Sequence, residues 1–354
     1  MSFENIIKRK SKLLLPFSWL YQTGVIIHNK IYDWGWKKSE AFDLPVICVG
    51  NLSVGGTGKT PMVEYLLRLL SSQYKVATIS RGYKRQSAGV LIANENTTAA
   101  DIGDEPMQFH SKFPAVKVVV AEKRAEGIQE VVKQFPETGV IILDDAFQHR
   151  AVKAGLNILL TDYNNLFTQD YYLPAGQLRD LKCNYTKADI IIITKCPAEL
   201  SVPQKYHVIK QIKPLLNQKI YFTTFNYSTP YNIFTRQTIS LTEVKEAVLV
   251  TGIANPQPLT SYLKRHDIGL KVLSFPDHHK FSQSDIDGVK EAYQSIKQQN
   301  KIIITTEKDS MRLKEFVNSL QALPVYALPV QHHILFDEGD DFNNLIYRFI
   351  QNKK

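Results

Sequence analysis

Cysteine is scarce in this chain of 354 residues, which contains only three. Cys48, Cys183 and Cys196 do not have the spacing of a metal-binding motif, and three cysteines cannot form a fully paired disulfide framework. The sequence therefore excludes a small disulfide-stabilised scaffold and favours a protein of a reducing compartment.

Long hydrophobic runs, internal repeats and blocks of charge are also missing. The apolar stretch near the N-terminus falls short of the roughly 20 residues that span a membrane. It is interrupted by Pro16, Gln22, His28 and Asn29. Lys and Arg are scattered, without zinc-finger spacing or a basic tail, so we expect no nucleic-acid binding. The net charge of +9 then indicates a nucleotide or an anionic membrane as the acidic partner.

The first forty residues combine basic and apolar side chains. Four basic residues come first: Lys8, Arg9, Lys10 and Lys12. No small-residue cleavage site follows the apolar run, which argues against a signal peptide. Positions at helical spacing are Leu20, Gly24, Ile27, Ile31 and Trp34. This pattern predicts an amphipathic helix that either lies on an anionic membrane or packs on the domain core, and the two can apply to different faces.

From residue 46 onward, short runs rich in Val and Ile alternate with helical patterns. The predicted strands are 46–49, 75–80, 116–120, 140–143, 157–161 and 190–194, and a helix is predicted over 61–70. Continuous apolar strands that alternate with helices favour a mostly parallel sheet covered on both faces. Ligands bind such sheets beyond the carboxyl ends of the strands.

The pattern changes near residue 215, and the chain is long enough for two domains. Residues 219–226 and 232–239 are predicted to form a strand pair. Strands at 247–251, 271–275 and 301–305 then alternate with helices at 258–266 and 283–298, before a terminal helix at 342–350. We therefore divide the chain into an N-terminal helix (1–40), a larger α/β domain (41–218), a β-stranded linker (219–240) and a smaller α/β domain (241–354).

The first strand leads into a glycine-rich turn that has the order of a phosphate-binding loop. The expected nucleotide contacts are Ser53, Val54, Gly55, Gly56, Thr57, Gly58, Lys59 and Thr60. Glycines let backbone N–H groups approach phosphate oxygens, Lys59 reaches the phosphates and Thr60 binds Mg²⁺. The general pattern has glycine where this chain has Ser53, and a turn without a ligand is the alternative interpretation.

Asp144 follows the apolar strand at 140–143, in the position of an acid that holds Mg²⁺ directly or through water. Asp145 doubles the local charge, and Gln148 follows three residues later. A helix N-cap is the alternative for Asp144 alone. Beside a phosphate loop, the metal role is the better interpretation.

Other polar motifs are ambiguous from the residues alone. Asp104 and Glu105 begin an apparent helix, where acids complement the helix dipole. His278 is either a general base or a surface residue. Three arginines lie near predicted strand ends or loops, where each can bind a phosphate or none: Arg81, Arg124 and Arg179. The segment 306–309, Thr-Glu-Lys-Asp, ends another strand and carries a weak signal for nucleotide binding.

Taken together and in order, these motifs resemble the tetraacyldisaccharide 4′-kinase (lipid A 4′-kinase) family. The resemblance covers the chain from the N-terminal helix to about residue 315. It rests on segments 51–60 (NLSVGGTGKT), 81–83 (RGY), 103–106 (GDEP), 143–150 (LDDAFQHR), 173–180 (LPAGQLRD), 275–279 (FPDHH) and 306–309 (TEKD). Ser53 is normal for this family, and Ala146 is a minor departure from a common glycine.

The resemblance implies a P-loop NTPase-like kinase with a second, smaller α/β domain. It implies ATP and Mg²⁺ as cofactors, and transfer of the γ-phosphate to the 4′-hydroxyl of a tetraacyldisaccharide 1-phosphate, a lipid A precursor. The place of action is the cytoplasmic face of the bacterial inner membrane, with peripheral or monotopic attachment. We expect no obligate protein partner.

The resemblance also implies roles for individual residues. Asp104 is the expected catalytic carboxylate, paired with His278. Lys59, Arg124 and Arg179 are the expected contacts to phosphate or to the transition state. The implied surroundings of Mg²⁺ are Thr60, Asp144, Asp145, Glu105 and Gln148. From the residues alone, another phosphate-loop kinase, a GTPase-like switch and a non-catalytic nucleotide-binding scaffold remain as alternatives.

Overall fold

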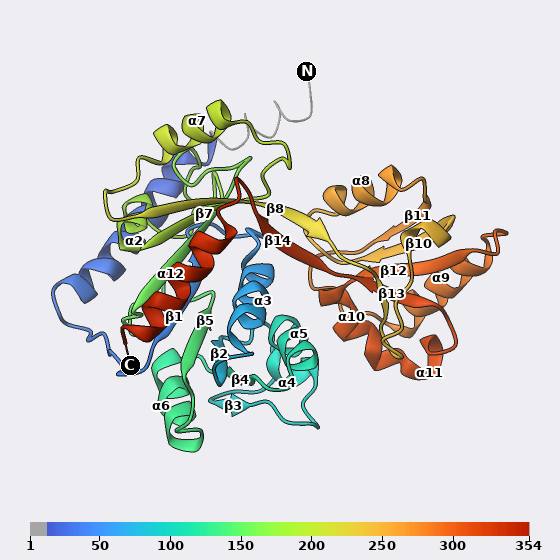
Figure 1. Cartoon of the computed structure of the whole chain (residues 1–354), viewed down its shortest axis with the longest axis horizontal. Helices are drawn as coiled ribbons and strands as arrows, with labels where there is room; N and C mark the ends of the chain where they lie inside the picture. The colour runs from blue at the N-terminus through green and yellow to red at the C-terminus, as the bar shows by residue number, and fades with distance from the viewer. Residues whose placement is uncertain (1–12, 354) are drawn as a thin grey trace.

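The structure, a computed structural model, describes residues 13–353 and contains two β-sheets (Figure 1). The strands of the large sheet are β1 (Val46–Asn51), β2 (Val76–Ser80), β3 (Leu91–Ile92), β4 (Lys117–Val120), β5 (Val140–Asp144), β6 (Leu156–Asp162), β7 (Ile190–Thr194), β8 (Lys219–Tyr227) and β14 (Val330–Ile334). Their order is β14-β8-β7-β6-β1-β5-β2-β4-β3. The inner strands are parallel, and only the end pairs β3–β4 and β8–β14 are antiparallel. The predicted α/β class with a mostly parallel sheet is confirmed.

Helices cover both faces of the large sheet, which explains why inner strands such as β1, β5 and β7 are mostly apolar. One face packs against α3 (Lys59–Leu70), α5 (Asp104–Lys112) and α12 (Gly339–Gln351), next to the short α4 (Ala99–Ile102). The other face packs against α6 (Arg124–Gln134) and α7 (Val202–Ile212). Successive residues of β1 alternate between the two cores: Val46 and Cys48 enter one, and Ile47 and Val49 enter the other.

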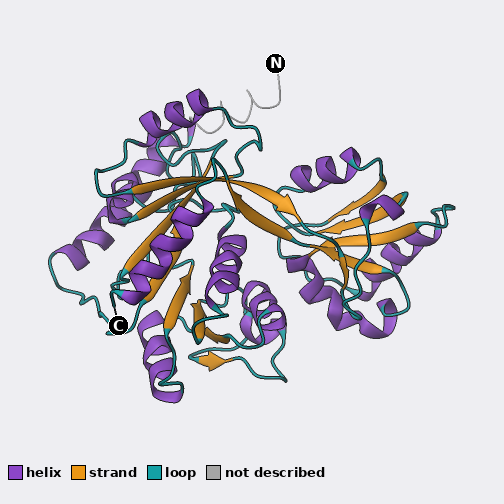
Figure 2. Ribbon diagram, in the orientation of Figure 1, coloured by secondary structure: helices purple, strands orange, loops and turns teal. Residues whose placement is uncertain are grey.

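The small sheet has the order β11-β10-β12-β13-β9. Its strands are β9 (Tyr231–Asn232), β10 (Glu246–Thr251), β11 (Gly269–Ser274), β12 (Lys301–Thr306) and β13 (Val325–Leu328). The helices α8 (Gln257–Arg265), α9 (Gln283–Gln294), α10 (Glu307–Leu313) and α11 (Val317–Leu320) lie around it (Figure 2). Separate apolar clusters fill its two faces, so this sheet has a core of its own.

The predicted strand pair between residues 219–226 and 232–239 is wrong. β8 lies between β7 and β14, whereas β9 pairs with β13 of the small sheet. β9 is short because the Asn232 side chain accepts hydrogen bonds from the backbone N–H groups of Phe234 and Thr235 and turns the chain. Each segment is rich in Thr and aromatic residues, which indicated a strand but could not specify its partner.

The end of the chain returns from the small sheet to the large one. β14 pairs with β8, and these two strands connect the sheets (Figure 1). In α12, Phe342, Ile346 and Ile350 are buried in the core of the large sheet. The expectation that residues 241–354 all belong to the smaller unit is therefore wrong from Val330 onward. The sequence predicted a terminal helix at 342–350, but not which sheet would cover it.

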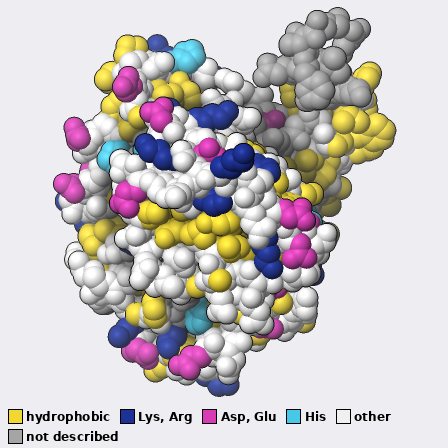
Figure 3. Space-filling view, turned by 90° about the vertical axis from the view of Figure 1, so that its right-hand side faces the viewer, with side chains coloured by type: hydrophobic (Ala, Val, Ile, Leu, Met, Phe, Trp, Pro, Cys, Tyr) yellow, Lys and Arg dark blue, Asp and Glu magenta, His cyan; other side chains and the backbone are white. Residues whose placement is uncertain are grey.

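The N-terminal helix α2 (Leu15–Asp33) packs through its polar face. Ser18 Oγ donates to the carbonyl of Tyr172 at 2.8 Å, and Asn29 Nδ2 donates to Asp180 Oδ1 at 3.3 Å. Apolar side chains point outward instead: Phe17, Trp19, Leu20, Ile27 and Trp34 are exposed. Figure 3 shows hydrophobic side chains gathered at the upper right of the molecule. Over residues 13–353, no helix has the length and apolarity to cross a membrane. The basic residues Lys8, Arg9, Lys10 and Lys12 lie outside the described residues.

Candidate functional site

The glycine-rich loop joins β1 to α3 in a conformation that leaves its backbone accessible. Gly55 and Gly58 have φ angles of +99° and +89°, which favour glycine over residues with a side chain. Val54, Gly55 and Gly56 are exposed. Ser53 is instead buried and forms a β-bridge with Leu178, so this position has no need for glycine. This explains why the loop departs from the general phosphate-loop pattern.

Three charged side chains meet at the base of this loop. Lys59 Nζ lies 3.7 Å from Asp145 Oδ1, and Arg179 forms a two-pronged ion pair with the same carboxylate. Burial would raise the pKa of Asp145, but Lys59 and Arg179 outweigh burial and lower it. The structure thus brings Lys59, Arg179 and Asp145 together at the base of the loop.

Asn51 completes this cluster and was missed as a site residue. Its Oδ1 accepts hydrogen bonds from Arg179 Nη2 at 2.7 Å and from Lys59 Nζ at 3.4 Å. Its Nδ2 donates to Thr57 Oγ1 at 2.9 Å, inside the loop. A single buried amide thus joins both cations to the loop. The only sequence signal was its place at the start of the loop.

Asp144 ends β5 as a buried carboxylate with an unsatisfied oxygen. Its Oδ1 has no hydrogen-bond partner within the described chain. Burial raises its pKa to about 8, and Glu105 and Asp145 add to the effect by repulsion. An unpaired buried carboxylate beside further acids fits a cation.

The other expected metal contacts lie around the phosphate loop or on α5. Thr60 is in the first turn of α3, Glu105 is the second residue of α5, and Gln148 donates to the carbonyl of Asn51. Residues 13–353 contain no group of three or more His, Cys, Asp or Glu side chains with metal-binding geometry. This fits Mg²⁺, which proteins bind through one or two carboxylates together with substrate phosphates.

Arg124 does not contact the phosphate loop in the way that Arg179 does. It begins α6, is 3% exposed, and donates from Nη1 to the carbonyls of Ala121 and Glu122. Burial lowers its pKa to about 10. Within residues 13–353 it forms no ion pair, although its charge acts on Asp144 and Asp145. Arg179, by contrast, reaches the loop directly.

Asp104 and His278 meet across the boundary between the two sheets. Asp104 begins α5, and His278 follows β11 in a left-handed turn with φ of 59°. The Nδ1 atom of His278 lies 3.2 Å from Asp104 Oδ2. Arg312 Nε lies 3.4 Å from the same oxygen. Two residues that are 174 positions apart therefore form one hydrogen-bonded pair.

The backbone before Asp104 explains the two short motifs around it. Gly103 has a φ of +91°, and a Cβ there would lie 2.9 Å from the carbonyl oxygen of Tyr83. Only glycine therefore lets α5 begin this close to the segment 81–83. The Tyr83 ring in turn meets the His278 ring edge-on, with centroids 5.2 Å apart.

Lys308 and Arg312 are the contacts that the sequence did not identify as part of the site. Lys308 Nζ lies 2.9 Å from His278 Nε2. Both residues are on α10, and the segment 306–309 that begins this helix was noted for a weak nucleotide-binding signal and as a motif of the family resemblance, without a role for either side chain. Their approach to Asp104 and His278 depends on the packing of α10 against α5, which no local pattern encodes.

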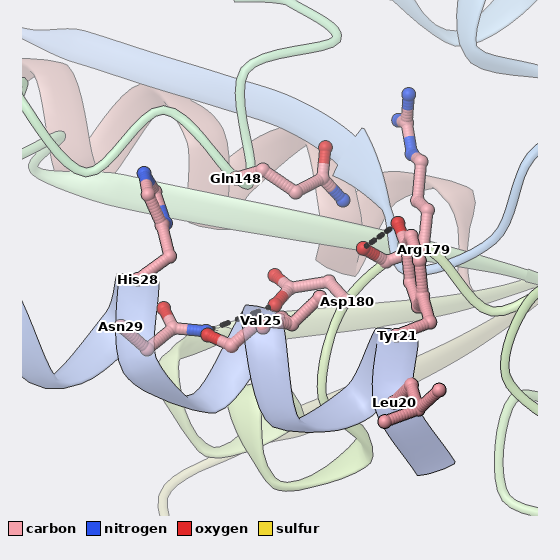
Figure 4. A pocket seen from close by; sticks show the side chains of 9 residues that line it. Leu20, Tyr21, Val25, His28, Asn29, Gln148, Arg179 and Asp180 are labelled. Carbon is pink, nitrogen blue, oxygen red and sulfur yellow. Dashed lines mark hydrogen bonds between the residues drawn. The ribbon is translucent and has the colours of Figure 1, made fainter. Parts of the chain in front are cut away.

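A cavity of about 320 Å³ lies between α2 and the loop that carries Arg179 (Figure 4). Its lining includes Leu20, Tyr21, Val25, Gln148 and Arg179. The Tyr21 hydroxyl donates to the carbonyl of Arg179 at 3.1 Å, so the helix is tied to the same segment that reaches the phosphate loop. The cavity therefore links the exposed helix to the charged cluster.

Comparisons with known proteins agree with this geometry. A family model described as tetraacyldisaccharide-1-P 4′-kinase matches residues 10–351. A tetraacyldisaccharide 4′-kinase of Bacteroides thetaiotaomicron is 44% identical, with 96% of this chain and 93% of the relative covered. One of Flavobacterium johnsoniae is 45% identical, with 92% and 95% covered. A crystal structure of LpxK from Aquifex aeolicus in complex with ATP has a TM-score of 0.75 and 31% identity, and covers 96% of this chain and 99% of that one.

Proposed function

The chain belongs to the tetraacyldisaccharide-1-P 4′-kinase family and is a kinase, and we propose that it transfers the γ-phosphate of ATP to the 4′-hydroxyl of tetraacyldisaccharide 1-phosphate. The product would be lipid IVA. The observation that carries this proposal is the pair of Asp104 and His278, adjacent in the chain to Glu105, whose charge acts on the buried Asp144. A carboxylate in that place supplies what a sugar hydroxyl lacks, a proton acceptor at neutral pH.

In the proposed reaction, the 4′-oxygen forms a bond to the γ-phosphorus while the bond from phosphorus to the bridging oxygen of ADP breaks. The hydroxyl proton moves to Asp104. Lys59 and Arg179 stabilise the negative charge on the transferring group, because both cations already lie at the base of the loop. Both ADP and the phosphorylated sugar then leave, and Asp104 returns its proton to solvent.

Arg124 has a different proposed role from Arg179. Its guanidinium donates to the carbonyls of Ala121 and Glu122, and its charge acts on both Asp144 and Asp145. We assign it to the electrostatics of the phosphate side rather than to direct contact with the nucleotide.

For Mg²⁺, Asp144, Thr60 and Glu105 are the proposed protein contacts, with Gln148 next to them. Bound there with ATP, Mg²⁺ would neutralise charge on the phosphates. The protein's own contribution is to keep Asp144 buried and unpaired at the end of β5, so that its oxygen is available. Asp145 forms ion pairs with Lys59 and Arg179, so we propose that it acts on Mg²⁺ only indirectly, by holding these two cations in place.

We place the protein at the cytoplasmic face of the inner membrane. Phe17, Trp19 and Leu20 are 59%, 66% and 72% exposed on α2, which suits a helix whose apolar face enters a bilayer surface. The polar face of the same helix is fixed to the segment that carries Arg179 and Asp180. The acyl chains of the substrate would remain in the bilayer while its sugar enters the site.

The proposal is tested by incubating the protein with ATP labelled at the γ-phosphate and tetraacyldisaccharide 1-phosphate in detergent micelles. Labelled lipid is expected from the wild type and not from the Asp104→Asn variant. A matched reaction with the lipid already phosphorylated at the 4′-position should give no label in lipid. Release of labelled phosphate without labelled lipid would show an ATPase instead and would overturn the proposal.

A further inference from the structure

We propose that Lys308 is a positioning residue that fixes the proton of His278 on Nδ1 and thereby orients Asp104 for the reaction. The inference rests on the proposed function, in which Asp104 accepts the proton of the substrate hydroxyl. It gives a role to the segment 306–309, which the roles assigned above leave without one.

Lys308 lies on the far side of the histidine ring from Asp104. Its Nζ lies 2.9 Å from His278 Nε2, while His278 Nδ1 lies 3.2 Å from Asp104 Oδ2. The ammonium is also held by Asp277 Oδ1 at 3.3 Å and lies 3.8 Å from Glu105 Oε1. The lysine side chain is 19% exposed, so its direction is set by these contacts.

The chemistry of the two groups determines where the proton lies. An ammonium group has three donors and no acceptor, so His278 Nε2 must accept the hydrogen bond with its lone pair. The single proton of the neutral ring is then on Nδ1, which donates it to Asp104. Without Lys308, only the Asp104 carboxylate at Nδ1 favours this tautomer, and Asp277 Oδ1, 4.0 Å from Nε2, is left as an acceptor for a proton on the other nitrogen.

The same helix holds Asp104 from a second direction. Arg312, one turn after Lys308, lies 3.4 Å from Asp104 Oδ2 through Nε and donates to the carbonyl of His279 at 2.5 Å through Nη1. With Oδ2 directed to His278 and Arg312, Oδ1 is the oxygen that we expect to accept the substrate proton.

The remaining residues of segment 306–309 fix α10 in place. The Thr306 hydroxyl accepts from the backbone N–H of Asp309 at 3.0 Å and caps the helix. Asp309 Oδ2 accepts from the backbone N–H of Gly252 at 3.0 Å and joins α10 to the end of β10. This framework allows Lys308 to be replaced without loss of the cap or of the Asp309 contact.

The test compares Lys308→Met, Lys308→Arg and the control Lys290→Met, which removes a lysine from the surface of α9. We expect Lys308→Met to lower kcat by roughly 10- to 100-fold while KM for ATP changes less than about threefold, because the group acts through the catalytic pair. Lys308→Arg should recover most of kcat, since a guanidinium also only donates. Wild-type kcat in Lys308→Met, or no recovery with Lys308→Arg, would overturn the inference.

A spectroscopic measurement tests it without relying on any Lys308 variant folding. In protein labelled with ¹⁵N-histidine, His278 should show a protonated Nδ1 and an unprotonated Nε2, with its signals identified by their loss in His278→Gln. A proton on Nε2 in the wild type contradicts the inference. Asp104→Ala is assayed in parallel: if it retains turnover, the proposed function fails, whereas if it is inactive and Lys308→Met is fully active, only the role of Lys308 fails.

Discussion

The Nε2 atom of His332 lies 2.9 Å from the carbonyl oxygen of Gly58, the last glycine of the phosphate loop. His332 is on β14, and its Nδ1 lies 2.8 Å from the hydroxyl of Thr223 on β8. Since the Gly58 carbonyl can only accept, Nε2 carries the proton and Nδ1 accepts from Thr223. Both strands that connect the two sheets therefore reach the phosphate loop through one buried ring.

This ring should make the protein sensitive to acid. Burial lowers the pKa of His332 to about 4, below the ordinary histidine value. Between about pH 6.5 and pH 4, the unfolded chain binds a proton at this histidine and the folded chain does not. The free energy of unfolding therefore decreases by up to about 3 kcal/mol as the pH falls through that range. In thermal unfolding, His332→Gln should lose less stability on acidification than the wild type. Parallel pH curves for the two proteins would contradict this assignment.

Replacement of Asp104 should remove turnover without removing ATP binding. Asp104→Asn is expected to lower kcat by about 10² to 10⁴, because the amide cannot accept the substrate proton. His278→Ala should cost less, and the double variant little more than Asp104→Asn, since the two side chains act as a unit. Steady-state kinetics and calorimetric titration with ATP measure both effects. If the fold-decrease in kcat of the double variant equals the product of the two single fold-decreases, the residues act independently.

Lys112 should be critical for stability because it lies between two buried carboxylates. Its Nζ is 2.6 Å from Glu64 Oε2 on α3 and 2.7 Å from Glu307 Oε1 on α10. Lys112→Met removes the ion pair of Glu307 and leaves Glu64 paired with Arg68 alone, and it should cost about 3 kcal/mol. Adding Glu64→Gln and Glu307→Gln to that variant should restore much of the loss. Urea unfolding measures these changes in the free energy of unfolding. An unchanged free energy of unfolding in Lys112→Met alone would refute the buried network.

The sequence predicted the strands and helices of both sheets better than their arrangement. Runs such as 140–143 and 190–193 are apolar throughout because both faces of each strand are covered, and that pattern is visible locally. β14 was not predicted, since Val-Gln-His-His-Ile is mostly polar and its strand conformation depends on pairing with β8. Its role in joining the sheets follows from that pairing, which no local property specifies.

The candidate site divides in the same way. Lys59, Thr60 and Asp144 follow from a loop and a strand end with a known physical purpose. Asp104 and His278 were ambiguous from their neighbours alone and were chosen through the family resemblance, because their contact joins residues of two different sheets. Lys308 and Arg312 were missed for that reason, as their contacts arise only when α10 lies against α5.

The exposed face of α2 should control binding to anionic vesicles. Replacing Phe17, Trp19 and Leu20 by serine removes three exposed apolar side chains, each worth about 1.5–3 kcal/mol when buried in an apolar environment. Vesicle affinity should fall by at least 10²-fold in sedimentation, while turnover of substrate in micelles changes less. The matched control replaces Val202, Tyr206 and Leu216, which are also exposed, by serine. Equal losses in the two triple variants would argue against a specific role for α2.

Asp144 should lower the stability of the nucleotide-free protein while serving the reaction. Its pKa is raised to about 8, first by burial and then by Glu105 and Asp145. Between about pH 4 and pH 8, the folded chain therefore keeps a proton that the unfolded chain has released, so the free energy of unfolding decreases as pH rises. Asp144→Asn removes the ionisation and fits the same space.

The Asn variant should consequently unfold at a higher temperature than the wild type, with a difference on the order of 1–3 kcal/mol near pH 8 and a smaller one near pH 5. The same change should abolish the additional thermal stabilisation that Mg²⁺ gives in the presence of ATP, because a neutral amide binds a divalent cation weakly. Calorimetric unfolding at both pH values, with and without Mg²⁺ and ATP, measures both effects in one series. A variant that is less stable than the wild type at high pH would mean that the Asp144 carboxylate is satisfied by the protein itself, and its proposed part in holding the cation would then lose its physical basis.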